Sequence, residues 1–220
     1  MTTVVLGIDT ATDVRAGVAR DGQVVAADVF ADRRAHAEQL LPLVQQVLSG
    51  AGATPKDLTG VVVGVGPGPF TGLRVGVATA ITLAEVLGVP VRGVCSLDVV
   101  ALEWVDRGDA PADGFVVVAD ARRKEVYWAV YDGTGARVDG PFVTAPGEVT
   151  NLPLAGPGAT LTGRECSGPE AIDAGRMAAA GDRLVDAGLE PLYLRRPDAE
   201  VPTTRKSTLL QPRLAMMGKP

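Results

Sequence analysis

The sequence predicts an α/β protein built from two lobes. Short apolar runs alternate with amphipathic stretches, which is typical of strands and helices that follow one another. An apolar run that ends in an aspartate occurs twice, first at Asp9 and again at Asp120. A glycine-rich loop also joins a buried strand to a helix. The 220 residues suffice for one domain or two compact lobes.

The first lobe is expected to open with three antiparallel strands. Residues 4–8 and 16–19 are apolar, and Asp21-Gly22 leads from the second run into residues 23–30. An Asp-Gly pair between two strand-like runs indicates a tight hairpin, because both residues tolerate the left-handed backbone of such a turn.

An amphipathic helix is predicted next. The apolar residues that share its face are Ala37, Leu40, Leu41, Val44, Val47 and Leu48. Pro42 lacks the N–H that a helix interior needs. The helix is therefore expected either to begin near residues 40–41 or to kink at Pro42.

A buried strand over residues 58–65 runs into the glycine-rich loop, and a second helix is expected from Thr71 to Leu87. Thr71 is the predicted N-cap, and Gly88 is the predicted stop. A strand over residues 91–94 and a helix over 97–104 complete the first lobe.

Residues 107–113 are rich in Gly, Pro and Asp, and the opening pattern then restarts. Apolar runs at 115–119 and 126–131 are followed by Asp132-Gly133, which indicates a faint internal duplication. Residues 155–163 are a candidate strand, and a helix is expected over 170–184. We predict a first lobe at 1–107, a smaller second lobe at 108–196 and a loosely ordered tail at 197–220.

The composition argues against several classes of protein. The formal net charge of −5 argues against a chain that binds nucleic acid by itself. Two cysteines, Cys95 and Cys166, are too few for a disulfide framework and fit a reducing cytoplasm. With no uncharged apolar run near 18 residues and no basic leader, we expect no membrane span and no export signal.

The glycine-rich loop matches neither common phosphate-binding motif. Pro69 stands where a dinucleotide fingerprint starting at Gly64 needs its last glycine, and no lysine follows as in a P-loop. Its glycines either let the backbone and a helix N-terminus approach an anion or only shape a sharp turn. Asp9 and Asp120 are likewise either metal-linked carboxylates or turn formers.

Few residues offer catalytic chemistry. His36 is the single histidine, so a two-histidine metal site is impossible and Cys95 has no histidine base. We predict neither a catalytic residue nor a metal site. The stripe of Gly72, Gly76 and Ala80 packs either on the lobe's own sheet or in a subunit interface. The run 122–124 (RRK) is either a solvated loop or a contact for an acidic partner.

Five segments together resemble the TsaB (YeaZ) family. They are LGIDT at 6–10, HAEQLLP at 36–42, GVGPGPFTGLRVG at 64–76, VADARRKEVY at 118–127 and PLYLR at 191–195. The resemblance covers about residues 1–196, and GPGPFTGLR is its most specific part.

The resemblance implies a two-lobed actin-like ATPase (ASKHA, ribonuclease H-like) fold with a reduced second lobe. It also implies a non-catalytic, cytoplasmic subunit in the synthesis of N6-threonylcarbamoyladenosine at position 37 of tRNAs that decode ANN codons. Such a subunit binds the catalytic paralogue TsaD, which holds its metal with a histidine pair, or a second copy of itself. The ATPase TsaE joins the TsaB–TsaD pair, and tRNA is reached only through the complex.

The expected partner interface lies on the two first-lobe helices. Its candidate residues are Leu40, Leu41, Val44, Phe70, Thr71, Gly72, Arg74, Val75, Gly76, Thr79 and Ala80. We expect no cofactor. Weak candidates for residual nucleotide binding are Asp9, Thr10, Gly66 and Gly68. The alternative hypothesis is an autonomous nucleotide-dependent enzyme of the same fold, either kinase-like or a metallohydrolase.

Overall fold

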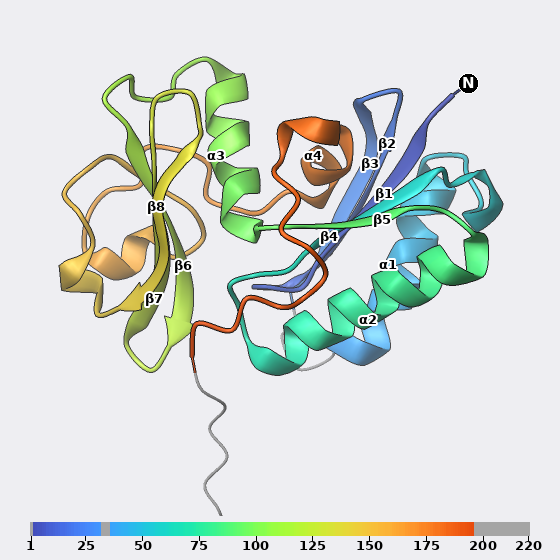
Figure 1. Ribbon diagram of the computed structural model, residues 1–220, viewed down its shortest axis with the longest axis horizontal. Helices are drawn as coiled ribbons and strands as arrows, with labels where there is room; N and C mark the ends of the chain where they lie inside the picture. Colours follow the sequence, from blue (N-terminus) through green and yellow to red (C-terminus); the bar gives the residue numbers. More distant parts are fainter. Residues whose placement is uncertain (1, 32–35, 196–220) are drawn as a thin grey trace, which may run out of the picture.

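The computed structural model describes residues 2–31 and 36–195 (Figure 1). Its first sheet has the strand order β3-β2-β1-β4-β5. The strands are β1 (Val4–Asp9), β2 (Val14–Arg20), β3 (Gln23–Phe30), β4 (Gly60–Gly64) and β5 (Val91–Val94). The β1–β2 and β2–β3 pairs are antiparallel, whereas β1–β4 and β4–β5 are parallel. Asp21 and Gly22 have φ of 49° and 74°, which confirms the predicted hairpin.

Helices cover both faces of the first sheet. The helices α1 (His36–Gly50) and α2 (Phe70–Leu87) bury their apolar stripes on one face. The short helix α4 (Ala174–Ala179) lies against β1, β2 and β3. Gly7 and Gly17 face each other across β1 and β2, and a Cβ on either would overlap the α4 backbone. These two glycines therefore let α4 approach the sheet closely.

The second sheet repeats the topology of the first. It has the order β8-β7-β6-β9, with strands β6 (Phe115–Arg122), β7 (Glu125–Tyr131), β8 (Arg137–Thr144) and β9 (Leu154–Ala155). Two antiparallel pairs and one parallel pair occur in the same places as in β3-β2-β1-β4. The predicted duplication is thus confirmed at the level of strand order.

Helix α3 (Ser96–Arg107) packs on the second sheet. The rings of Trp104 and Phe115 have centroids 4.7 Å apart, and Phe115 stacks on Tyr131 at 5.6 Å. Burying three aromatic side chains in one cluster removes a large apolar area from water. Short 3-10 helices occupy Pro55–Asp57, Pro146–Glu148, Ala159–Thr162 and Gly181–Arg183.

Two predicted helix starts are wrong. Of the two alternatives for the first helix, a start near residues 40–41 is wrong, because α1 begins at His36 and contains Pro42; the kink at Pro42 stays a prediction. Thr71 is not the N-cap of α2, because Pro69, with its extended backbone (φ −65°, ψ 136°), already occupies that position and the helix begins at Phe70. A proline is pre-set for such a position because its ring fixes φ.

The predicted elements of the second lobe are shorter than expected. The helix expected over 170–184 is reduced to α4, since Asp173 caps its N-terminus by accepting from the backbone N–H of Gly175 and of Arg176. The strand within 155–163 is reduced to β9, and Gly156 follows it with φ 99°. The predicted tail at 197–220 lies outside the described residues.

The chain returns to the first sheet after α4. The backbone N–H of Ala187 donates to the Gly93 carbonyl at 2.8 Å, and that of Leu192 donates to the Val65 carbonyl at 2.8 Å. The boundaries at 107 and 196 stay a prediction, and α4 with this returning segment lies beside the first sheet.

Among the described helices, α2 alone is long and apolar enough to cross a membrane by length and composition. It carries Arg74 and Glu85. Its residues Leu73, Val77 and Ala80 are buried in the core of this chain, as in a helix that covers a sheet.

Candidate functional site

Asp9, at the end of β1, is completely buried, and each of its carboxylate oxygens accepts a hydrogen bond from the same chain. Its Oδ2 accepts a hydrogen bond of 2.6 Å from the Ser96 hydroxyl, and its Oδ1 accepts one of 2.8 Å from the backbone N–H of Ala11. Burial raises the pKa of Asp9 above its ordinary value of 3.8, while the Ser96 and Ala11 hydrogen bonds act in the opposite direction.

The glycine-rich loop packs tightly on this aspartate. A Cβ on Gly64 would overlap the Asp9 carboxylate, and one on Gly68 would come within 2.8 Å of the Ala11 Cα. The backbone N–H of Gly66 donates to the Ser96 hydroxyl oxygen at 3.2 Å, and the N–H of Ser96 donates to the Gly66 carbonyl at 2.8 Å. These glycines therefore serve close packing of the chain against itself.

Thr10 fixes the start of α2 in the same cluster. Its hydroxyl donates a 2.7 Å hydrogen bond to the Gly72 carbonyl, and a Cβ on Gly76 would overlap its Oγ1. The structure thus brings together all four nucleotide-binding candidates, Asp9, Thr10, Gly66 and Gly68, and all four are buried.

Asp120, the counterpart of Asp9 in the second lobe, makes the same local turn. Its Oδ1 accepts a 2.7 Å hydrogen bond from the backbone N–H of Arg122, two residues ahead, as Asp9 does from Ala11. The Asp120 carboxylate also pairs with the Arg122 guanidinium at 3.1 Å. Of the two alternatives for these aspartates, both residues have the geometry of turn formers.

The expected interface residues divide by exposure. Leu41 is 49% exposed, Thr71 and Arg74 are exposed, and Phe70, Val75 and Thr79 are partly buried. The remaining candidates, Leu40, Val44, Gly72, Gly76 and Ala80, are buried inside this chain. The small-residue stripe of α2 therefore faces Thr10 and the first sheet.

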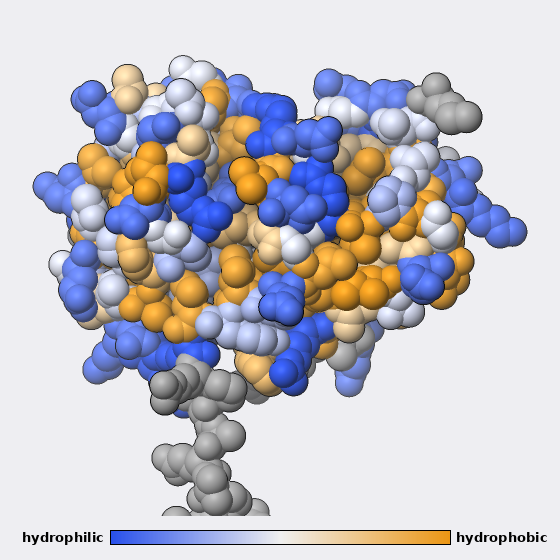
Figure 2. Space-filling model, in the orientation of Figure 1, coloured by the Kyte–Doolittle hydropathy of each residue, from blue (hydrophilic) through white to orange (hydrophobic). Residues whose placement is uncertain are grey.

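Phe70 and Arg74 of the expected interface meet Tyr193 in a cluster that the sequence did not reveal. The Arg74 guanidinium carbon lies 3.8 Å from the centroid of the Phe70 ring, and its Nε donates to the Tyr193 hydroxyl at 2.9 Å. The rings of Phe70 and Tyr193 are 4.8 Å apart. Apolar residues also gather over α2 and β5 (Figure 2). Of the apolar residues of α2, Ile81 and Val86 are exposed.

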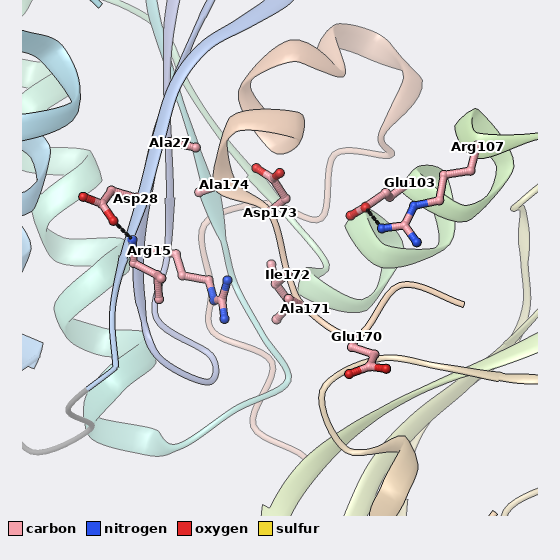
Figure 3. Close-up of a pocket in the computed structure, with 11 residues that line it drawn as sticks. Arg15, Ala27, Asp28, Glu103, Arg107, Glu170, Ala171, Ile172, Asp173 and Ala174 are labelled. Carbon is pink, nitrogen blue, oxygen red and sulfur yellow. Dashed lines mark hydrogen bonds and ion pairs between the residues drawn. The ribbon is translucent and has the colours of Figure 1, made fainter. Parts of the chain in front are cut away.

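A pocket of about 300 Å³ lies between β2, β3, α3 and the start of α4 (Figure 3). Its wall carries both signs of charge, from Arg15, Glu103, Arg107 and Asp173 among others. The Arg15 guanidinium pairs with Asp13 at 3.0 Å, and its Nε is buried without a hydrogen-bond partner. Glu103 is paired with Arg107. No pattern in the sequence indicated this pocket.

Within residues 2–31 and 36–195, no three side chains of His, Cys, Asp or Glu come together in a way that could hold a metal ion. Cys95 is buried, and burial raises the pKa of its thiol to about 12. Such a thiol is almost entirely protonated at neutral pH and is a poor nucleophile.

Comparison with known proteins places these features in a family. The family model described as "TsaD: tRNA N6-adenosine threonylcarbamoyltransferase" matches residues 25–174, which is more than half of the chain. An uncharacterized protein of Mycobacterium tuberculosis (strain ATCC 25618 / H37Rv) is 48% identical over 205 residues, covering 89% of this chain and 93% of that protein.

Two further relatives carry names. The tRNA threonylcarbamoyladenosine biosynthesis protein TsaB of Escherichia coli (strain K12) is 36% identical over 128 residues, which are 58% of this chain and 54% of that protein. The solved structure of YeaZ from Pseudomonas aeruginosa superposes with a TM-score of 0.69 at 25% identity, over 87% of this chain and 100% of that one. The two-lobed actin-like fold implied by the resemblance is thereby confirmed. The chain belongs to the TsaD family and, within it, to the group of TsaB (YeaZ) proteins.

Proposed function

We propose that this chain acts in the biosynthesis of N6-threonylcarbamoyladenosine at position 37 of tRNA, as a non-catalytic subunit that binds and activates a TsaD-like catalytic subunit. The family match and the TsaB relatives support the pathway. The match to these TsaB proteins spans 54% of their length, so the assignment of the whole activity is part of the proposal.

The buried Asp9 cluster is the observation that carries the non-catalytic role. In this cluster Asp9 and Thr10 direct their oxygens to Ser96, Ala11 and Gly72 of the same chain. A carboxylate that holds a metal or orients a phosphate has to present its oxygens to the ligand. Because the oxygens of Asp9 and Thr10 already form hydrogen bonds within the chain, we infer that this end of β1 stabilises the fold and does not bind a ligand.

The partner surface that we propose is made of the exposed and partly buried members of the predicted interface. These are Leu41, Phe70, Thr71, Arg74, Val75 and Thr79. Arg74, whose guanidinium lies over the Phe70 ring and donates to the Tyr193 hydroxyl, is of the residue type that often dominates binding energy. Leu41 adds exposed apolar area to the same set of residues. The same surface would pair two copies of the chain when the catalytic subunit is absent. We further propose that TsaE joins the pair, that no cofactor is needed, and that the work is done in the cytoplasm.

Two measurements on the purified chain test this function. Co-purification with the TsaD homologue of the same organism, followed by a threonylcarbamoylation assay with each subunit alone and together, should show activity only for the pair. ATP turnover by the chain alone, with and without Mg²⁺, should stay at background. Robust turnover by the chain alone would instead favour the autonomous nucleotide-dependent enzyme.

A further inference from the structure

Tyr193 is held in place by the segment that returns to the first sheet after α4 (Figure 1). On one side of it, the backbone N–H of Leu192 donates to the Val65 carbonyl at 2.8 Å, just beyond the end of β4. On the other side, the Arg195 guanidinium donates to the Ala121 carbonyl of β6 at 3.1 Å. Tyr193 itself is 38% exposed. The two anchors therefore fix the backbone of a tyrosine whose side chain remains at the surface.

Tyr193 contacts Arg74, near the start of α2, although the two residues are 119 positions apart. The Arg74 Nε donates to the Tyr193 hydroxyl at 2.9 Å, and the Arg74 guanidinium carbon lies 3.8 Å from the centroid of the Phe70 ring. The ring centroids of Phe70 and Tyr193 are 4.8 Å apart. An exposed arginine ordinarily samples many rotamers, and a partner that fixes it has to overcome the lost entropy. Here contacts within the chain already hold the guanidinium in one orientation.

The Arg74 guanidinium keeps one edge for a partner. A guanidinium has five N–H donors in one plane, and the Nε–H of Arg74 is taken by the Tyr193 hydroxyl. No carboxylate within residues 2–31 and 36–195 forms an ion pair with Arg74, which is exposed. The Nη1 and Nη2 groups remain, and two parallel N–H groups of this kind match the two oxygens of a carboxylate.

The proposed partner surface contains Arg74, so a bound catalytic subunit would cover this guanidinium. A cation that loses water and gains no counter-charge is strongly unfavourable. Because the described part of the chain supplies no carboxylate to Arg74, the counter-charge has to come from the partner. The partner group that fits the open edge of the guanidinium best is a carboxylate.

The neighbours of Arg74 on α2 favour a protein carboxylate over a phosphate. Ala78 and Ile81 follow Arg74 by four and seven residues, so the three share one side of the helix, and all three are exposed. Protein interfaces combine apolar area with aromatic residues and arginine. A phosphate contact operates through charge and needs neither apolar nor aromatic neighbours.

We propose that Tyr193 is a positioning residue for the partner surface, which holds Arg74 so that its Nη1 and Nη2 groups pair with a carboxylate of the TsaD-like catalytic subunit. This inference rests on the proposed function, because it takes that subunit as the partner. Tyr193 acts through Arg74, so the effect of its hydroxyl on binding depends on the presence of the arginine.

A double-mutant cycle in the full-length protein tests this dependence. Affinity for the TsaD homologue of the same organism is measured by isothermal titration. Tyr193→Phe keeps the ring and removes the hydroxyl that accepts from Arg74, and Arg74→Gln removes the charge. Lys56→Gln, at an exposed position of the 3-10 helix before β4, is the control of equal charge change. Urea denaturation followed by circular dichroism checks that each variant folds.

Arg74→Gln should weaken binding at least about tenfold, and Tyr193→Phe about three- to tenfold. In the Arg74→Gln background, Tyr193→Phe should change the affinity by less than about twofold, because no guanidinium is left to position. Arg74→Lys should bind nearly as weakly as Arg74→Gln, since lysine keeps the charge but not the planar pair of donors. Arg74→Glu should bind more weakly than Arg74→Gln through like-charge repulsion. Lys56→Gln should bind like the unmodified chain.

Four results would overturn the proposal. Additive losses in the double variant would show that Tyr193 acts independently of Arg74, and an affinity unchanged by Tyr193→Phe would show that it positions nothing. An Arg74→Glu variant that binds no more weakly than Arg74→Gln would show that the partner group is not a carboxylate. Weaker binding of an unmodified tRNA transcript by Arg74→Gln, with unchanged affinity for the TsaD homologue, would favour a phosphate contact.

The same titrations separate this proposal from the proposed function. Normal affinity of both Arg74→Gln and Tyr193→Phe for the TsaD homologue would overturn the inference and leave the proposed function standing. No measurable binding by the unmodified chain would overturn the proposed function, and the inference would fall with it.

Discussion

The hydroxyl of Ser96, at the start of α3, donates a hydrogen bond of 2.6 Å to the buried carboxylate of Asp9, at the end of β1. The two residues are 87 positions apart, and the same hydroxyl oxygen accepts the backbone N–H of Gly66. Three segments of the chain, namely the end of β1, the loop after β4 and the first turn of α3, therefore meet at one side chain.

Ser96→Ala should lower the free energy of unfolding by about 1–3 kcal/mol, because it leaves a buried carboxylate oxygen without its donor. Urea denaturation followed by circular dichroism measures the change. Ser49→Ala, at an exposed position of α1, is the matched control and should change stability by less than about 0.5 kcal/mol. Equal effects at the two serines would mean that the Asp9 contact contributes nothing.

Asp9→Asn should alter how stability depends on pH. Burial raises the pKa of Asp9, so the folded chain keeps a proton that the unfolded chain releases, and this group's contribution to stability falls as the pH rises through the folded pKa. Urea denaturation over about pH 4 to 8 should therefore show the variant gaining stability relative to the unmodified chain as the pH increases.

Asp57→Asn is the control of opposite sign. Hydrogen bonds from the Thr54 backbone and hydroxyl lower the pKa of Asp57, so its contribution is present at high pH and is lost as the pH falls through the folded pKa. Because the Asp57 carboxyl titrates near and below 3.8, the series is extended down to about pH 2, and the Asp57 variant should lose stability relative to the unmodified chain as the pH rises from about 2 to 5. Parallel pH curves for Asp9→Asn and the unmodified chain would contradict the raised pKa of Asp9.

Gly76→Arg should destabilise the fold and should not yield a folded monomer. Even a Cβ at this position would overlap the Thr10 hydroxyl, which itself holds the Gly72 carbonyl. Overpacking of this kind costs about 1–3 kcal/mol or more. Thermal unfolding compares it with Ala78→Arg, on the exposed face of the same helix, which should fold normally. A well-folded Gly76→Arg protein would contradict this prediction and would show that α2 can move away from Thr10 at little cost.

Leu41→Glu should weaken association with the catalytic subunit, or with a second copy, while the chain stays folded. Leu41 is 49% exposed on α1, so the change removes apolar contact area and adds a charge to the proposed partner surface. Isothermal titration and sedimentation should show at least a tenfold loss of affinity, which is about 1.4 kcal/mol. Val138→Glu, 60% exposed on the second lobe, is the matched control and should bind normally.

EDTA should leave the melting temperature unchanged, because the described side chains offer no group of three metal ligands. Differential scanning calorimetry of the full chain with and without the chelator makes the comparison. Added Zn²⁺ should likewise have no stabilising effect. A fall of several degrees on chelation would reveal a metal site that involves residues beyond those described.

Local signals were sufficient for much of this fold. Asp21-Gly22 predicts its hairpin because these two residues adopt the left-handed turn backbone at low cost, and no distant contact is needed. The repeat of an apolar run ending in aspartate predicts the duplicated strand order, again from local interactions. In each copy the aspartate carboxylate accepts a hydrogen bond from the backbone N–H of the residue two positions ahead. The sequence motifs also identified the TsaB (YeaZ) group correctly.

The sequence by itself thus determined the fold class, the hairpins, the duplication and the family, all of which depend on residues close together in the chain. Only the tertiary structure decided that the stripe of Gly72, Gly76 and Ala80 faces inward, and that Arg74 meets Tyr193 from 119 positions away. A helix face is equally apolar whether its own sheet or a second subunit covers it, so periodicity cannot say which surface it meets. Which surface covers the apolar face of α2 depends on how segments far apart in the sequence pack in the folded protein. Burial is a property of the two surfaces in contact and not of either segment alone.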